Sequence, residues 1–173
     1  AAVLTEGISV IHNCPDLEDV AATVEILKYL GCGVRRENET LIVDSYTLEK
    51  HTIPCEMMQK LRSSIIFMGA LLARCGKAEI CSPGGCELGP RPIDLHIWGL
   101  RSLGARITDR DGTLVCEAQN KKGKEIILSI PSVGATENLM LYATACRGET
   151  VIINAAREPE IVGLQDYLNA AGF

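Results

Sequence analysis

This chain of 173 residues has few aromatic residues, no long apolar run and no excess of positive charge. Only 4% of the residues are aromatic, so a buried core must be aliphatic. The longest apolar run, residues 65–73, is far shorter than the roughly 20 residues that cross a bilayer. The net charge is −5, from 17 Lys and Arg against 22 Asp and Glu. This excludes a broad electrostatic surface for nucleic acid or for anionic lipid, and we expect neither as a partner.

The chain also lacks the cysteine-rich composition of a small protein held together by disulfides. The eight cysteines are spread over the chain without a repeated close spacing, at a density below that of small secreted scaffolds. The N-terminal residues have neither a basic stretch nor an apolar signal core. We therefore expect a cytoplasmic protein with reduced, mostly buried thiols. An apolar fraction of 47% and a charged fraction of 23% are typical of one globular domain.

An internal repeat organises the sequence. Gly7, Gly76 and Gly148 each follow residues typical of a helix end and precede an alternating strand pattern. These glycines are 69 and 72 residues apart. A second pattern, helix end, glycine, strand, turn and strand, occupies residues 30–43 and again 103–116. The repeating unit is therefore strand, helix, strand, strand, helix.

The repeat divides the chain into units at about 1–70, 71–142 and 143–173, the last one truncated. Because both ends of the chain fall inside a unit, we expect a single incomplete domain that is a fragment of a longer polypeptide.

Two kinds of helix are predicted. Residues 16–30, 92–103 and 159–171 form amphipathic helices, the first with apolar residues at helical spacing from Leu17 to Leu30. Residues 57–74 and 132–145 are apolar nearly all round, which is typical of buried helices. We expect an α/β fold in which sheets surround a helical centre.

The densest functional signal lies between residues 81 and 96. Its glycines and prolines predict a loop between a strand and a helix, with the thiol of Cys86 directly after two glycines. Arg91 stands near the predicted helix start, where backbone N–H groups favour anions and can lower a thiol pKa. A connector with a buried thiol is the structural alternative. Metal binding by Cys81 and Cys86 is another, although no second pair has zinc-like spacing.

The run Pro83-Gly84-Gly85-Cys86 followed by Arg91-Pro92-Ile93-Asp94-Leu95-His96 closely resembles the UDP-N-acetylglucosamine enolpyruvyl transferases. Residues 61–65, 131–136 and 154–162 agree with the same family, and the likeness covers the whole chain. The resemblance implies an inside-out α/β barrel. It implies transfer of enolpyruvate from phosphoenolpyruvate to the sugar 3′-hydroxyl, the first committed step of peptidoglycan synthesis. It implies no cofactor and no metal.

The resemblance also assigns roles to residues. Cys86 matches the family's proton donor, which is also the thiol that fosfomycin alkylates, and Arg91 matches an arginine that contacts substrate phosphates. The stretch Pro92, Ile93, Asp94 and Leu95 matches the uridine side of the pocket.

Two further segments match binding residues. Arg62 matches a sugar-nucleotide contact, with an ion pair to Glu56 or Glu158 as the structural alternative. Ser132, Val133 and Gly134 match a diphosphate seat at a helix start, with a simple Ser N-cap as the alternative.

Three further polar or aromatic residues are expected to be structural. His96 should lie on a helix surface or pack, Trp98 should pack, and Arg157 should serve a hinge or an interdomain contact.

The family enzyme has a second domain, which supplies a general base and further arginines, and a Lys-Asn pair that binds phosphoenolpyruvate lies upstream of the part matched here. We therefore expect the isolated chain to be inactive, with that second domain as its partner. The competing hypothesis is a non-catalytic, truncated paralogue that binds sugar nucleotide or a partner domain.

Overall fold

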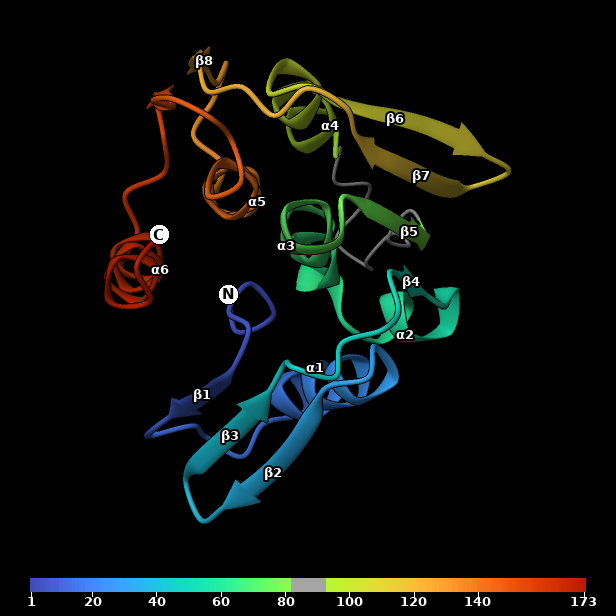
Figure 1. Ribbon diagram of the computed structural model, residues 1–173, viewed down its shortest axis with the longest axis vertical. Helices are drawn as coiled ribbons and strands as arrows, with labels where there is room; N and C mark the ends of the chain where they lie inside the picture. Colours follow the sequence, from blue (N-terminus) through green and yellow to red (C-terminus); the bar gives the residue numbers. More distant parts are fainter. Residues whose placement is uncertain (82–92) are drawn as a thin grey trace.

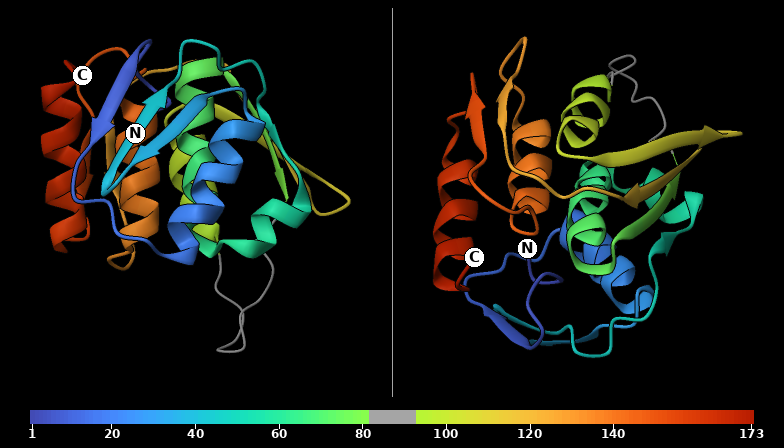
Figure 2. Two further views of the ribbon diagram at one scale, coloured as in Figure 1. Left: turned by 90° about the horizontal axis from the view of Figure 1, so that it is seen from below. Right: turned by 45° about the horizontal axis from the view of Figure 1, so that its top comes forward.

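The computed structural model describes residues 1–81 and 93–173, arranged as three sheets around a helical centre (Figure 1). Sheets and amphipathic helices lie toward the outside, and two apolar helices run through the middle (Figure 2). The predicted α/β architecture, with sheets outside and helices inside, is confirmed.

The first unit contains β1 (Ile8–Ile11), α1 (Glu18–Tyr29), β2 (Gly33–Glu37) and β3 (Thr40–Asp44). Its antiparallel sheet has the order β1-β3-β2. Residues before β1 form turns, whereas the repeat predicted a helix end there.

The second sheet contains β4 (Thr52–Ile53), from the end of the first unit, and β5 (Lys77–Cys81), β6 (Ala105–Arg110) and β7 (Thr113–Ala118) of the second unit. The second unit also contains α4 (Asp94–Ser102). The sheet order is β4-β5-β7-β6, with β4 and β5 parallel and the other pairs antiparallel. Asp111 and Gly112 adopt φ angles of 52° and 82°, which a tight hairpin turn requires at both central residues.

The third sheet joins β8 (Glu125–Ile127), from the end of the second unit, to β9 (Val151–Ile153) of the third unit, which also contains α6 (Pro159–Ala170). The strands β8 and β9 pair in parallel, as β4 and β5 do across the boundary between the first and second units. Likewise, the order β1-β3-β2 repeats the order β5-β7-β6. The sequence repeat is therefore also a repeat of sheet topology.

The predicted buried helix over residues 57–74 is wrong in one respect, because it is broken. The structure has α2 (Cys55–Lys60), a 3₁₀ helix (Arg62–Ile66) and α3 (Phe67–Cys75). Leu61 separates the first two with extended backbone, at φ −131° and ψ 112°. The buried Ser64 hydroxyl donates to the Met58 carbonyl at 3.1 Å, which provides a partner for a carbonyl near the break.

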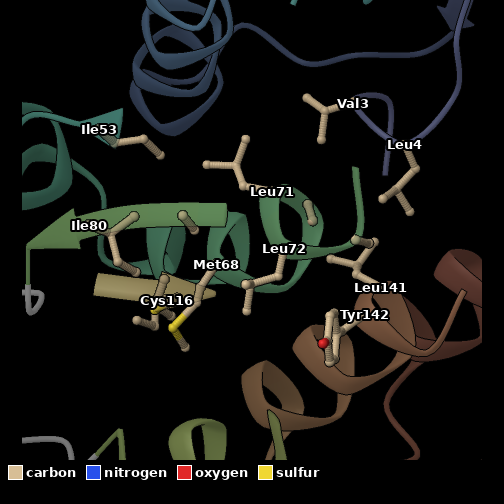
Figure 3. Close-up of a cluster of buried hydrophobic side chains, with 14 of the residues drawn as sticks. Val3, Leu4, Ile53, Met68, Leu71, Leu72, Ile80, Cys116, Leu141 and Tyr142 are labelled. Carbon is tan, nitrogen blue, oxygen red and sulfur yellow. The ribbon is translucent and has the colours of Figure 1, made fainter. Parts of the chain in front are cut away.

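The core is aliphatic, as the shortage of aromatic residues predicts. Met68, Leu71 and Leu72 of α3 are fully buried and lie between the sheets and α5 (Val133–Ala143), as Figure 3 shows. Tyr142 of α5 is the largest fully buried side chain. The core therefore places the two buried helices in direct contact at the centre of the molecule.

Cys55 and Cys81 are joined by a disulfide, with their Cα atoms 5.0 Å apart. The expectation of uniformly reduced thiols is wrong for this pair. Their approach follows from the parallel pairing of β4 with β5, in which Ile53 faces Ile80, so that both cysteines lie just beyond the last paired residues.

The remaining described cysteines are free: Cys14, Cys32, Cys75, Cys116 and Cys146. Burial raises the pKa of Cys116 to about 12 and that of Cys32 to about 11, where Asp44 adds to the effect. Such thiols are poor nucleophiles at neutral pH, in agreement with a packing role.

Candidate functional site

The residues predicted to bind substrate sit at the starts of three helices. Arg62 begins the 3₁₀ helix, Asp94 begins α4, and Ser132 is the N-cap of α5. Arg62 and Ser132 are half-buried, whereas Asp94 is exposed. Cys86, Arg91 and Pro92 lie outside the described residues.

The first turns of α4 and α5 lie side by side. A Cβ on Gly134, in the first turn of α5, would lie only 3.1 Å from Cε1 of His96, in the first turn of α4. Ile93 and Leu95, which stand close to His96 in sequence at the start of α4, are half-buried. The structure thus brings the predicted uridine side and the predicted diphosphate seat together.

The start of α5 has the features of an anion seat. The Ser132 hydroxyl accepts from the Ala135 N–H at 3.3 Å, so the N-cap that was the structural alternative is present. The cap does not use the N–H groups of Val133 and Gly134, which have no intrahelical acceptor at this position. The helix dipole adds partial positive charge there, and a phosphate group would be stabilised by both effects.

Arg62 carries an unsatisfied buried group. Its Nη1 atom is buried and has no hydrogen-bond partner among the residues that the structure describes. Within the described residues, no ion pair joins Arg62 to Glu56 or Glu158, so the structural alternative is not observed. A buried guanidinium nitrogen without a partner is costly, and an anionic ligand would relieve that cost.

A corner at residues 154–158 packs against the same end of α5. The Ala156 N–H donates to the Thr136 hydroxyl at 3.1 Å, and Asn154 turns the chain with a φ of 60°. Pro131 and Arg157 line a hollow of about 420 Å³ beside it. Arg157 itself is exposed, which leaves its guanidinium free to face another part of a larger protein.

His96 is buried, as expected of a packing residue, and Asn138 of α5 is completely buried beside it. Burial lowers the pKa of His96 to about 4. Sequence reasoning missed Asn138, although a polar residue inside an apolar helix is a signal that a buried partner exists. Trp98 is 46% exposed and lies outside the buried core.

Among the described residues, no three His, Cys, Asp or Glu side chains gather in a way that could hold a metal ion. The disulfide also occupies Cys81, which weakens the alternative of a metal site with Cys86. In the same part of the chain, no helix is long and apolar enough to cross a membrane.

A family model described as EPSP synthase (3-phosphoshikimate 1-carboxyvinyltransferase) matches residues 1–173. The chain belongs to the EPSP synthase family. The resemblance seen in the sequence is confirmed at this level, because the family unites carboxyvinyl (enolpyruvyl) transferases.

Within the EPSP synthase family, the chain is similar to curated UDP-N-acetylglucosamine 1-carboxyvinyltransferases. A UDP-N-acetylglucosamine 1-carboxyvinyltransferase 2 of Caldanaerobacter subterraneus subsp. tengcongensis is 51% identical over 172 residues, which is 99% of this chain and 41% of that protein. A UDP-N-acetylglucosamine 1-carboxyvinyltransferase 1 of Symbiobacterium thermophilum is also 51% identical, over 99% of this chain and 40% of that protein. The chain thus spans about two fifths of the length of the curated relatives it matches.

Solved structures agree on the EPSP synthase family fold. The enolpyruvyl transferase NikO from Streptomyces tendae matches with a TM-score of 0.84 and 20% identity, over 97% of this chain and 40% of that one. An EPSP synthase from Acinetobacter baumannii matches with a TM-score of 0.68 and 20% identity, over 98% of this chain and 39% of that one. The predicted enolpyruvyl transferase fold is confirmed.

Proposed function

We propose that this chain is the catalytic-loop part of an enzyme that transfers enolpyruvate from phosphoenolpyruvate to the 3′-hydroxyl of UDP-N-acetylglucosamine and releases phosphate. The observation that carries the proposal is the 51% identity, over nearly the whole chain, to relatives named for this reaction. The proposal places the protein in the cytoplasm, at the first committed step of peptidoglycan synthesis. Cell shape and cell division would depend on it through the cell wall.

The chemistry is an addition followed by an elimination. The Cys86 thiol gives a proton to the methylene carbon of phosphoenolpyruvate, so that C2 becomes the electrophile for the sugar oxygen. A base outside this chain takes the hydroxyl proton. The methyl group then returns a proton as the carbon–oxygen bond to phosphate breaks, which regenerates the double bond on the new ether. A positioned acid of this kind contributes about 10²- to 10⁴-fold in rate.

The other predicted residues bind and orient the sugar nucleotide. Arg91 and Arg62 contact its phosphates, and the N–H groups of Val133 and Gly134 add to them. Residues 92–95 hold the uridine. The buried Nη1 of Arg62 has no partner in the described part of the chain, and it supports this part of the proposal because such an atom is stabilised by an anion.

The sheet topology supports a domain of three units. In the second unit, β5 pairs with β7 of a following hairpin, whereas β9 has only β8 as a neighbour among the described strands. We propose that further chain completes the third unit with a hairpin on that side of β9. A second domain would follow, in keeping with the greater length of the relatives.

An apolar hollow of about 360 Å³ is evidence for a third buried helix in the complete domain. The hollow lies between the first sheet and α3, and Ala1, Phe67 and Tyr167 line it. In the repeat, α3 precedes Gly76 and strand β5, and α5 precedes Gly148 and strand β9. By the same repeat, a helix leading into Ala1 would fill this hollow with apolar side chains.

Phosphate release by the full-length protein tests the proposal. With phosphoenolpyruvate and UDP-N-acetylglucosamine we expect turnover, and with shikimate 3-phosphate as the acceptor we expect none. Turnover with shikimate 3-phosphate alone would contradict the choice of acceptor. Absence of turnover with either acceptor would favour the non-catalytic paralogue. The isolated chain should release no phosphate, and turnover by it would contradict the view that it is a fragment.

Fosfomycin tests the thiol separately. After incubation of the full-length protein with fosfomycin and sugar nucleotide, peptide mass spectrometry should find one adduct, on Cys86. The exposed Cys75 is a natural control within the same chain. An adduct on Cys75, or no adduct, would contradict the role of Cys86.

A further inference from the structure

The side chain of Asn138 joins all three segments that carry predicted binding residues. Its Oδ1 accepts from the Gly69 N–H of α3 at 2.7 Å. Its Nδ2 donates to the Ile65 carbonyl of the 3₁₀ helix at 3.0 Å and lies 2.8 Å from Nδ1 of His96 in α4. Asn138 is itself part of α5 and is completely buried. One buried amide thus links the helices that begin at Arg62, Asp94 and Val133.

These bonds determine the tautomer of His96. The Gly69 N–H can only donate and the Ile65 carbonyl can only accept, so the orientation of the Asn138 amide is determined. Its NH₂ group therefore faces Nδ1 of His96, and Nδ1 must be the acceptor. The single proton of the neutral ring is then on Nε2.

The Cε1–Nε2 edge of the ring faces the start of α5. A Cβ on Gly134 would lie 3.1 Å from Cε1 and 3.5 Å from Nε2 of His96, closer than ordinary packing allows for the first of these. Glycine at position 134 therefore leaves room for the ring. The ring in turn sets the distance between the first turns of α4 and α5.

We propose that His96, held by Asn138 as the neutral Nε2–H tautomer, is a positioning residue of the sugar-nucleotide site. It keeps the start of α4, which carries the predicted uridine-side residues, at a fixed distance from the anion seat at the start of α5. The inference rests on the proposed function for its ligand, whereas the tautomer and the spacing rest on the contacts of His96 alone.

The first experiment is an NMR measurement of the ring nitrogens of His96 at pH 7, which needs no substrate. We expect the proton on Nε2 and an unprotonated Nδ1. A proton on Nδ1 would overturn the proposal whether or not the protein transfers enolpyruvate. This result therefore separates failure of the inference from failure of the proposed function.

The second experiment measures the KM for each substrate in the full-length enzyme. His96→Asn keeps an acceptor where Nδ1 was but removes the ring edge from Gly134. We expect the KM for UDP-N-acetylglucosamine to rise about ten-fold, because misplacement by even 1 Å is costly, and the KM for phosphoenolpyruvate to change much less. The matched control is His12→Asn at an exposed histidine, which should change neither. An equal rise in both constants, or no rise, would overturn the proposal.

A compensating pair separates positioning from general packing. Gly134→Ala alone pushes against the ring and should also raise the KM for the sugar nucleotide. In the double variant with His96→Asn, the smaller side chain leaves room for the new Cβ, and the increases should combine to less than their product. Independent, multiplying effects would show that the ring does not set this spacing.

Discussion

Gly69 and Asn138 bring the two buried helices into direct backbone contact. A Cβ on Gly69 would lie 2.4 Å from the backbone carbonyl oxygen of Asn138, and the Asn138 side chain accepts from the Gly69 N–H. That N–H lies in the first turn of α3, which follows the 3₁₀ helix directly. The Asn138 side chain therefore ties this turn of α3 to the neighbouring helix α5.

Gly69→Ala should destabilise the protein strongly, because the clash is with backbone atoms that cannot rotate away. Overpacking of this kind costs about 1–3 kcal/mol, and displacement of Asn138 from its hydrogen bond to the N–H of residue 69 adds to it. Urea unfolding followed by circular dichroism measures the change. The matched control is Gly163→Ala on α6, where a Cβ meets nothing within 4 Å and higher helix propensity should stabilise slightly. Equal effects of the two substitutions would contradict the close approach of α3 and α5.

Arg62→Met should separate binding from stability. Because Nη1 of Arg62 is buried without a partner in residues 1–81 and 93–173, we expect its removal to leave the free energy of unfolding unchanged or to raise it. The KM for UDP-N-acetylglucosamine should rise at least ten-fold, as expected when a charge-assisted contact to phosphate is lost. Arg35→Met, at an exposed arginine paired with Glu37, is the control and should change neither quantity. A large loss of stability with an unchanged KM would contradict the binding role.

Stability should decrease in mild acid because of His96. Burial lowers its pKa to about 4, below the ordinary value of 6.5, so the unfolded chain binds a proton that the folded chain does not. The neutral ring therefore contributes stability that is present above pH 6.5 and is lost as the pH falls toward 4. Urea midpoints measured across this range should fall less for His96→Asn than for the parent protein. Parallel pH dependence of the two proteins would contradict the depressed pKa.

The Cys55–Cys81 disulfide is unusual for the proposed cytoplasmic location, because cytosolic thiols are normally reduced, and its presence in the cell can be tested. When the protein is extracted into denaturant with an alkylating agent and no reductant, the free cysteines should be alkylated and Cys55 and Cys81 should not. Alkylation of both residues in this sample would show that the pair is reduced in the cell. A sample reduced before alkylation is the control, in which every cysteine should react.

Local signals in the sequence predicted most of the architecture. The glycine at 76 ends α3 with a φ of 70°, Asp111-Gly112 forms the expected hairpin turn, and the apolar spacing of residues 16–30 yields α1. Each of these depends on residues a few positions apart, where propensity and periodicity operate. The repeat then related one unit to the next.

What sequence reasoning missed depends on contacts between distant residues. Asn138 meets His96 and Gly69 across 42 and 69 positions, and Cys55 meets Cys81 across 26. No local pattern encodes such separations, and the break at Leu61 has the same cause, since packing overrode the helical periodicity. The roles of Cys86 and Arg91 lie outside the described residues and stay predictions.

The central claim, that Cys86 donates the proton in enolpyruvyl transfer, is tested most directly by replacing it in the full-length protein. Mass spectrometry of the sugar nucleotide after incubation with phosphoenolpyruvate detects the product as UDP-N-acetylglucosamine plus one enolpyruvyl group. We predict product with the parent protein and with Cys86→Asp, whose carboxyl group can also supply a proton, and none with Cys86→Ala. Product formation by Cys86→Ala at the parent rate would contradict the account.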